Sequence, residues 1–146
     1  MLQHGQSGST LPLRSPAFIC NVCSTSNPLP ANDMAMGRES GPCAACGSTV
    51  RLRAMIRLLS LGLYGRAMAI ADFPQRLDLV GRGLSDWHGY ADRLGAKLDY
   101  LNTHFHREPQ LDISAPPQDA YGSLDFLLAS DVFEHVAPPV SRAFDG

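Results

Sequence analysis

The chain has 146 residues, of which 45% are hydrophobic and 18% are charged, and its formal net charge is −2. This composition is that of a globular protein and excludes a largely disordered chain. Arginine and aspartate interrupt the most apolar window, residues 52–73, so the sequence excludes a bilayer-spanning segment there and we expect no membrane partner.

The N-terminal segment lacks the apolar core of a secretory signal, because Gln, His, Gly and Ser dominate its first half. We therefore expect a flexible tail over residues 1–16 and a cytoplasmic protein. Residues 1–57 are mildly basic and residues 58–146 are acidic. This distribution is compatible with nucleic acid as a partner but is too weak to establish one.

All four cysteines fall in two C-x-x-C pairs, Cys20 with Cys23 and Cys43 with Cys46. The spacing is typical of a zinc ribbon, in which four thiolates form a closed tetrahedral shell around a structural Zn²⁺. We expect this ribbon over residues 17–47. Two disulfides, a redox-active pair or no site at all are the alternatives. Nothing in the chain indicates an oxidising compartment, and neither pair opens a helix in a βαβ unit.

A helix within residues 48–73 is predicted to connect the ribbon to the rest of the chain, with Ser48 or Thr49 as its cap. Apolar residues recur along one face at helical spacing, which indicates a buried stripe. These residues are Leu52, Met55, Ile56, Leu59 and Leu63.

Three arginines of this helix, Arg51, Arg53 and Arg57, have two interpretations. They form either an ordinary solvated face or a patch that contacts an anionic substrate beside the ribbon.

From residue 74 onward, short apolar segments alternate with a helical one. We predict strands at 77–80, 98–102 and 124–129 and a helix at 86–94. This alternation predicts an α/β domain with a parallel sheet over residues 74–146. Trp87 and Tyr90 are expected to pack the helix or to line a pocket.

The first of these strands is predicted to run into a glycine turn. Gly81 and Gly83 are followed by Ser85 and Asp86, either of which is able to cap the next helix. Glycines allow a ligand to approach the backbone, and a helix start offers free amide hydrogens to an anion. A tight structural turn without a ligand is the alternative.

Polar side chains follow the last predicted strand: Asp131, Glu134 and His135. Ligands of open α/β sheets bind outside the carboxyl ends of the strands, so we expect a binding site here. The alternative for Glu134 and His135 is a helix start stabilised by an acidic side chain. His104 and His106 follow the second strand, but two ligands do not make a metal site.

Four segments, LVGRGLSD, LDYLN, LDI at 111–113 and SDVFEHV, resemble in order and spacing the motifs of class I S-adenosylmethionine-dependent methyltransferases. The resemblance covers about residues 76–144. It implies a partial Rossmann-like methyltransferase sheet preceded by a small four-cysteine zinc ribbon and a connecting helix. A ribbon before such a domain also resembles certain ribosomal RNA methyltransferases and sugar C-methyltransferases.

The resemblance also implies site residues and cofactors. Gly81 and Gly83 are expected under the methionine part of S-adenosylmethionine, Asn102 at the ribose and Asp112 at the adenine. Asp131 and His135 are expected to face the methyl acceptor, with His135 as the base. The chain departs from the family pattern at Asn102, where an acidic residue is usual.

The resemblance leads to two functional hypotheses. The first is methyl transfer to an unidentified acceptor, a small molecule or RNA. The second is a non-catalytic zinc-ribbon binding module with a degenerate methyltransferase scaffold. Because the chain ends about where the helix after the fourth family strand begins, we expect an incomplete domain whose edge at 124–129 is exposed and favours self-association.

Overall fold

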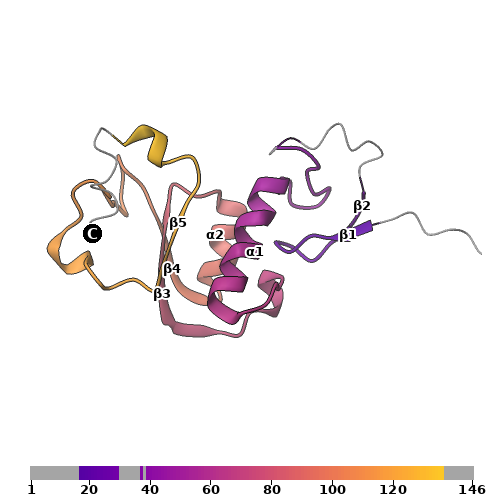
Figure 1. The fold of residues 1–146 in the computed structure, drawn as a ribbon, viewed down its shortest axis with the longest axis horizontal. Coiled ribbons are helices and arrows are strands. Elements are labelled where there is room, and N and C mark those ends of the chain that lie inside the picture. The colour runs from indigo at the N-terminus through magenta and orange to yellow at the C-terminus, as the bar shows by residue number, and fades with distance from the viewer. Residues whose placement is uncertain (1–16, 30–36, 38, 137–146) are drawn as a thin grey trace, which may run out of the picture.

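The structure is a computed structural model that describes residues 17–29, 37 and 39–136, so the tail predicted at 1–16 lies outside the described residues. The fold is mixed α/β (Figure 1). Its elements in chain order are β1 (Ala17–Ile19), β2 (Ser26–Pro28), α1 (Val50–Tyr64), η2 (Ile70–Asp72), β3 (Arg76–Leu84), α2 (His88–Gly95), β4 (Leu98–Thr103), η3 (Gln118–Ala120), β5 (Phe126–Ala129) and η4 (Phe133–His135). Neither α1 nor α2 is long and apolar enough to cross a membrane.

Strands β3, β4 and β5 form a parallel sheet in the order β4-β3-β5, which confirms the parallel α/β alternation predicted from the sequence. Gly83 at the centre pairs with Asn102 on one side and Leu128 on the other. The chain leaves β3 through α2 toward β4 and then returns to the opposite side of β3 as β5. The switch point, where ligands bind in open α/β sheets, therefore lies at the carboxyl ends of β3 and β5.

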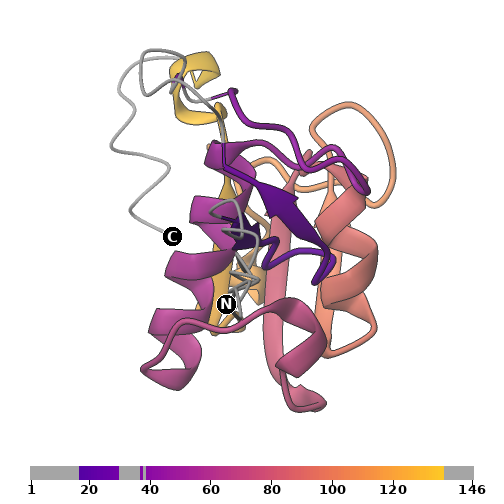
Figure 2. The same ribbon diagram turned by 90° about the vertical axis from the view of Figure 1, so that its right-hand side faces the viewer.

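Helices α1 and α2 both lie on one face of this sheet (Figures 1 and 2). Leu52, Ile56 and Leu59 of the predicted α1 stripe are buried, and Met55 and Leu63 pack against the same core. Fully burying a side chain of this size stabilises a fold by roughly 1.5–3 kcal/mol, so this face fixes α1 on the sheet.

Helix α1 is shorter than the predicted segment and ends at Gly65, whose φ of 69° is left-handed and whose amide donates to the Leu61 carbonyl. Glycine suits this C-terminal position because it has no Cβ to clash. At the other end Thr49 is the N-cap, but its side chain makes no capping hydrogen bond.

The predicted glycine turn is wrong, because β3 continues through both glycines to Leu84. A Cβ on Gly81 would overlap the ring of Phe126, and one on Gly83 would overlap the hydroxyl of Tyr100. The two rings, from β5 and β4, lie nearly parallel at 6.0 Å between centroids. The glycines therefore make room for aromatic side chains of the neighbouring strands.

The helix after β3 begins at His88, two residues later than predicted, and Trp87 is its N-cap without a side-chain capping bond. Asp86 does not cap the helix, since its carboxylate accepts a hydrogen bond from the Tyr100 hydroxyl. The side chain of Asn102 holds the Asp86 backbone on both sides, accepting from its N–H and donating to its carbonyl, each at 2.8 Å. The turn is therefore held by β4 rather than by a helix cap.

The ribbon strands β1 and β2 pair antiparallel and lie beside α1, on the side away from the sheet (Figure 1). Asn21, in the first C-x-x-C pair, donates from its side-chain amide to the Arg53 carbonyl of α1 at 2.8 Å and accepts at its own carbonyl from the Ile70 amide at 2.8 Å. These bonds attach the ribbon to the body of the protein.

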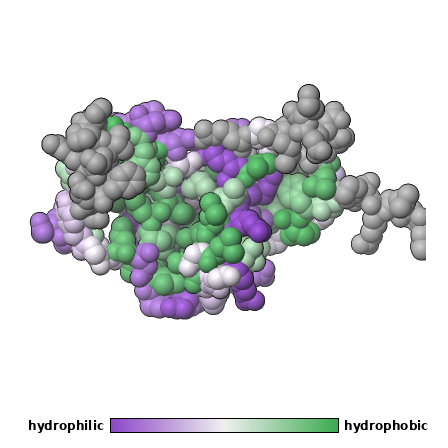
Figure 3. Space-filling view, in the orientation of Figure 1, coloured by the Kyte–Doolittle hydropathy of each residue, from purple (hydrophilic) through white to green (hydrophobic). Residues whose placement is uncertain are grey.

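An apolar surface extends across β5 and α1 on the face seen in Figure 3. Three leucines of these elements are exposed: Leu58 by 68%, Leu61 by 38% and Leu127 by 39%. Strand β5 is an edge of the sheet in the described part of the chain. The same side of the molecule thus combines an edge strand with exposed apolar side chains.

Candidate functional site

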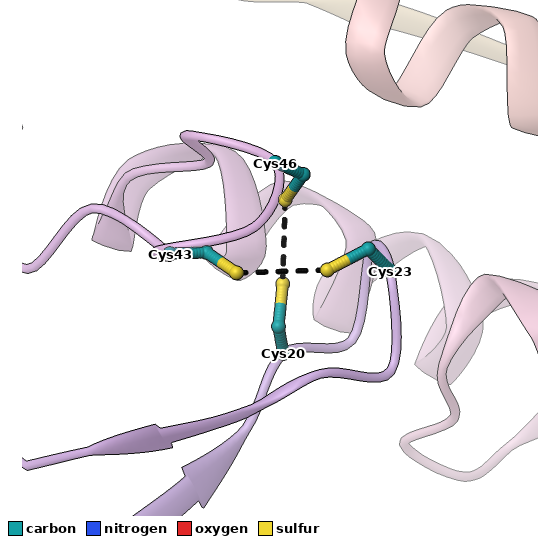
Figure 4. Close-up of side chains that lie close together, drawn as sticks. All are labelled: Cys20, Cys23, Cys43 and Cys46. Carbon is teal, nitrogen blue, oxygen red and sulfur yellow. Dashed lines mark hydrogen bonds between the residues drawn. The ribbon is translucent and has the colours of Figure 1, made fainter.

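The four cysteines meet at one point between the two ribbon turns, with their sulfur atoms directed at a common centre (Figure 4). All four Sγ atoms lie within 4.8 Å of one another. Cys20 and Cys46 are 3.8 Å apart at sulfur, and Cys23 and Cys43 are 3.5 Å apart. The two C-x-x-C pairs therefore form one cluster that can hold a metal ion.

The sulfur separations fit tetrahedral coordination. A Zn–S bond of about 2.3 Å places neighbouring sulfurs of a tetrahedron roughly 3.8 Å apart. A disulfide needs about 2.05 Å, and all four cysteines are free. The structure thus matches a four-thiolate metal centre and contains neither of the alternative disulfides.

The two turns that carry the cysteines have the same backbone geometry. Ser24 follows the first pair and Gly47 the second, with φ values of 63° and 76°. Each donates its amide to the carbonyl of the first cysteine of its pair, Ser24 to Cys20 at 2.7 Å and Gly47 to Cys43 at 2.8 Å. The left-handed residue closes each turn and directs its two thiols to the same side.

Polar groups around the sulfurs adjust their ionisation. The pKa of Cys43 is lowered to about 6, since burial raises it but hydrogen bonds from the backbone of Cys46 and Ala45 and from the Asn27 amide lower it by more. Burial raises the pKa of Cys46 to about 11. A coordinated divalent cation deprotonates thiols outright, so all four cysteines would be thiolates around it despite the different pKa values of Cys43 and Cys46.

Ser48 is fully buried, and its hydroxyl lies 3.2 Å from the sulfurs of both Cys20 and Cys46. Asn27 donates to the sulfur of Cys43 at 3.4 Å. Such partners around thiolates orient the ligands of a metal. The Asn27 donor therefore favours a negatively charged sulfur at Cys43, while the Ser48 hydroxyl accepts from the Cys46 thiol and fixes its position.

A second feature is a cavity of about 560 Å³ at the carboxyl ends of the sheet strands, which we call the strand-end cavity. Its walls come from the segments that follow β3, β4 and β5. It is lined by Leu84, Ser85, residues 103–106, residues 111–114, residues 130–132, His135 and Val136. It lies at the switch point, where an open α/β sheet binds its ligand.

The structure brings together three of the predicted site residues, because Asp112, Asp131 and His135 all line the strand-end cavity. Gly81, Gly83 and Asn102 do not line it. The glycines lie within β3, and the Asn102 side chain bonds the Asp86 backbone. A cofactor contact of these three residues stays a prediction that the cavity lining does not support.

Two residues of the cavity have left-handed backbones although neither is glycine, Ser85 with φ of 56° and Asp131 with φ of 58°. Each directly follows or nearly follows a strand, β3 and β5 respectively. Left-handed backbone at such residues costs free energy and gathers at functional sites. Ser85 was not predicted as a lining residue, since its position at the end of β3 follows only from the extension of this strand to Leu84.

His104, in the loop after β4, also lines the strand-end cavity. Its Nδ1 lies 3.4 Å from the Ser85 hydroxyl, and its Nε2 lies 3.1 Å from the Arg107 guanidinium. In the part of the chain that the structure describes, the four cysteines are the one group of three or more side chains arranged for a metal.

A smaller cavity of about 260 Å³, which we call the polar annex, shares Ser85, Ser130 and Asp131 with the strand-end cavity. Its other lining residues are Arg51, Leu52, Asp86, Trp87 and Tyr90. Trp87 and Tyr90 therefore line a pocket, which is one of the two roles predicted for them. Tyr90 also packs the core, where it is fully buried.

Unpartnered polar atoms lie at the annex. Oδ1 of Asp86 and the hydroxyl of Tyr90 are buried and make no hydrogen bond of ordinary geometry with the described residues. Burial raises the pKa of Asp86, an effect that the neighbouring hydroxyls of Tyr100 and Tyr90 partly offset. A buried polar atom without a partner costs free energy, so the annex is suited to a ligand or water that donates hydrogen bonds.

Comparisons with protein-family models, with curated proteins and with solved structures found no match for this chain.

Proposed function

We propose that the chain binds S-adenosylmethionine in the strand-end cavity and transfers its methyl group to an unidentified acceptor, a small molecule or RNA. The observation that carries the proposal is the convergence of Asp112, Asp131 and His135 on one cavity at the switch point of a parallel sheet. A volume of about 560 Å³ is in the range of pockets that enclose a cofactor-sized ligand.

The lining residues suit the nucleoside and the methionine end of this cofactor. Leu84, Leu111 and Ile113 supply apolar surface to a nucleoside, and the Asp112 carboxylate accepts hydrogen bonds from amino or hydroxyl groups. In the annex, Oδ1 of Asp86 and the Tyr90 hydroxyl suit an ammonium group. S-adenosylmethionine carries an ammonium on its methionine end and supplies an electrophilic methyl group when bound.

His135 is the proposed base, because it lines the cavity while its side chain remains 77% exposed beside Glu134. A neutral imidazole accepts the proton that an acceptor loses when it is methylated. Asp131 is held by an ion pair with Arg51 and is proposed to position the acceptor. Beyond this proton transfer, the protein is proposed to accelerate the reaction by holding S-adenosylmethionine and the acceptor in the orientation for methyl transfer.

We also propose that the cysteine cluster binds Zn²⁺ in a structural role. Four thiolates fill a tetrahedral shell and leave no open position for catalysis. The Asn27 amide, which donates to the sulfur of Cys43, supports a thiolate ligand at that position.

The second candidate function is a non-catalytic zinc-ribbon binding module. It is favoured by the packing of Phe126 and Tyr100 over Gly81 and Gly83, which fills the space above the glycines with protein. Under this hypothesis the strand-end cavity binds no cofactor, and cofactor binding therefore separates the two functions.

The test is calorimetric titration of the zinc-loaded chain with S-adenosylmethionine, using Asp112→Asn and Asp119→Asn as a matched pair. Asp119 is exposed and lines none of the cavities described above. A hydrogen bond to a charged group contributes about 1.5–3 kcal/mol, so Asp112→Asn is expected to weaken binding about tenfold or more while Asp119→Asn binds normally. Absence of binding by the intact chain contradicts the methyltransferase proposal and leaves the binding module.

A further inference from the structure

A third cavity, an open groove of about 700 Å³, lies between the ribbon, the first half of α1 and the segment that follows this helix. We call it the ribbon groove. It is lined by Phe18, Ile19, Asn21, Arg53, Arg57, residues 66–69 and Asp72. It shares no lining residue with the strand-end cavity or the polar annex.

The groove is cationic. Arg53, Arg57 and Arg66 line it against one acidic residue, Asp72. Arg57 and Arg66 are exposed, and their guanidinium groups form no ion pair or hydrogen bond with any residue that the structure describes. Two arginines therefore remain available to an anion from solution.

Arg53 has a different role in the groove. Its guanidinium lies over the Phe18 ring at 4.6 Å from the centroid, and it donates to the carbonyls of Ser48 and Gly41. These contacts fix Phe18 and Arg53 as one wall. Arg51, the third arginine of the patch considered from sequence, is directed elsewhere and pairs with Glu39 and Asp131.

The groove also has an apolar surface. Ile19 of β1 is 63% exposed, although the strand to which it belongs is paired. Phe18, Met68 and the alanines on either side of Met68 extend this surface toward the arginines. Apolar and aromatic side chains beside unpaired arginines are the combination that binds bases and phosphates of a single strand.

We propose that the ribbon groove binds single-stranded nucleic acid, with Arg57 and Arg66 on consecutive phosphates and the Phe18 and Ile19 wall against a base. The site is independent of the cofactor proposal, because it uses none of the residues of the strand-end cavity. It also gives the ribbon a direct contact with a ligand in addition to its proposed structural zinc.

The experiment is fluorescence anisotropy of a 5′-labelled oligouridylate of twelve nucleotides with the zinc-loaded full chain, measured at several salt concentrations. Each phosphate contact on a single strand contributes about 0.7 to the slope of log affinity against log salt. The double variant Arg57→Ala/Arg66→Ala is expected to bind about tenfold or more weakly at low salt, with a slope reduced by about 1.4. Zinc content and circular dichroism confirm that the variant is folded.

The matched control is Arg76→Ala/Arg93→Ala, which removes the same charge outside the groove. It is expected to bind as the unaltered chain does. Ile19→Ser is a second variant, and it is expected to weaken binding with an unchanged salt slope, because it removes apolar contact and no charge.

Three results overturn the proposal. One is no binding of the oligonucleotide at low salt, and another is an equal loss in the two double-arginine variants, which indicates net charge alone. The third is competition by uridine monophosphate or inorganic phosphate as strong as by the unlabelled oligonucleotide, which indicates a site for a single phosphate. A DNA strand of matching sequence and a duplex serve as further competitors, and the duplex is expected to compete more weakly than the single strand.

Discussion

Arg51 and Asp131 form an ion pair, with 3.2 Å between Nη1 of the arginine and Oδ2 of the aspartate. Arg51 stands in the first turn of α1, three residues after Ser48, whose hydroxyl contacts two of the cysteine sulfurs. Asp131 stands at the carboxyl end of β5 and lines the strand-end cavity. The start of α1 therefore joins the metal centre to the proposed cofactor site.

Replacing Arg51 by Met tests this connection. The ion pair is partly exposed, so we expect the free energy of unfolding to fall by no more than about 1 kcal/mol. Affinity for S-adenosylmethionine is expected to fall more, because Asp131 loses the ion pair that helps to orient it. Arg76→Met, which breaks an exposed pair with Asp78 away from the cavity, is the matched control. Equal affinities of the two variants in calorimetric titration would count against the positioning role.

Removal of the metal is expected to unfold the ribbon. Among the described residues of the segment between the cysteine pairs, Asn27 is the one buried side chain. The free energy of metal binding is the free energy of ordering such a site. We expect one zinc per chain by mass spectrometry of the native protein, and a lower Tm after chelation or in Cys43→Ser. A Tm unchanged by chelation would show that the ribbon is stable without metal.

Gly81→Ala is expected to destabilise the protein by about 1–3 kcal/mol, because its methyl group overlaps the Phe126 ring. In the double variant with Phe126→Leu the loss is expected to be less than the sum of the single losses, as measured by urea unfolding. Gly62→Ala is the control, since a Cβ at this position meets no atom within 4 Å. This variant is expected to lose no stability, because alanine favours a helix interior more than glycine does. Additive losses at Gly81 and Phe126 would contradict the packing role of the glycine.

The stability of the protein is expected to depend on pH through Asp86. Burial raises its pKa in the folded state, so the folded protein binds this proton more tightly than the unfolded chain does. The stabilisation is fully present below the unfolded pKa and is lost as pH rises through the folded pKa. Urea midpoints of the unaltered chain should therefore fall relative to Asp86→Asn as pH rises through that window. Parallel pH profiles of the two proteins would contradict this assignment.

The apolar side of β5 and α1 is expected to support self-association, as the sequence predicts for the exposed edge. Leu127→Lys places a charge on the edge strand, a substitution that opposes strand pairing between copies. Analytical ultracentrifugation is expected to show association of the unaltered chain and a shift toward monomer in the variant. Lysine in place of Leu77, an exposed leucine at the start of β3, is the control. A monomer at all concentrations would contradict the prediction.

Features that depend on local sequence were predictable. The cysteine spacing led to a cluster that the structure confirms, because each turn needs only four or five consecutive residues. The buried stripe at Leu52, Ile56 and Leu59 was predictable from helical periodicity. The three strands of the parallel sheet were predicted in their order along the chain, although β3 extends beyond the apolar segment predicted at 77–80.

Features that depend on distant residues were not predictable. Gly81 and Gly83 resemble a turn until the rings of Phe126 and Tyr100, from the neighbouring strands, are placed above them. The arginines of α1 likewise look equivalent in sequence. Tertiary structure directs Arg51 to Asp131 and leaves Arg57 in the ribbon groove.

The location of the cofactor site is tested most directly by ¹H–¹⁵N correlation spectra of the zinc-loaded chain titrated with S-adenosylmethionine. If the cofactor binds in the strand-end cavity and the polar annex, saturable shifts are expected at the amides of Ser85, Asp86, His104, Asp112 and Asp131, with the ribbon amides unchanged. Absence of shifts at saturating concentrations, or shifts confined to the ribbon, would contradict this location of the site.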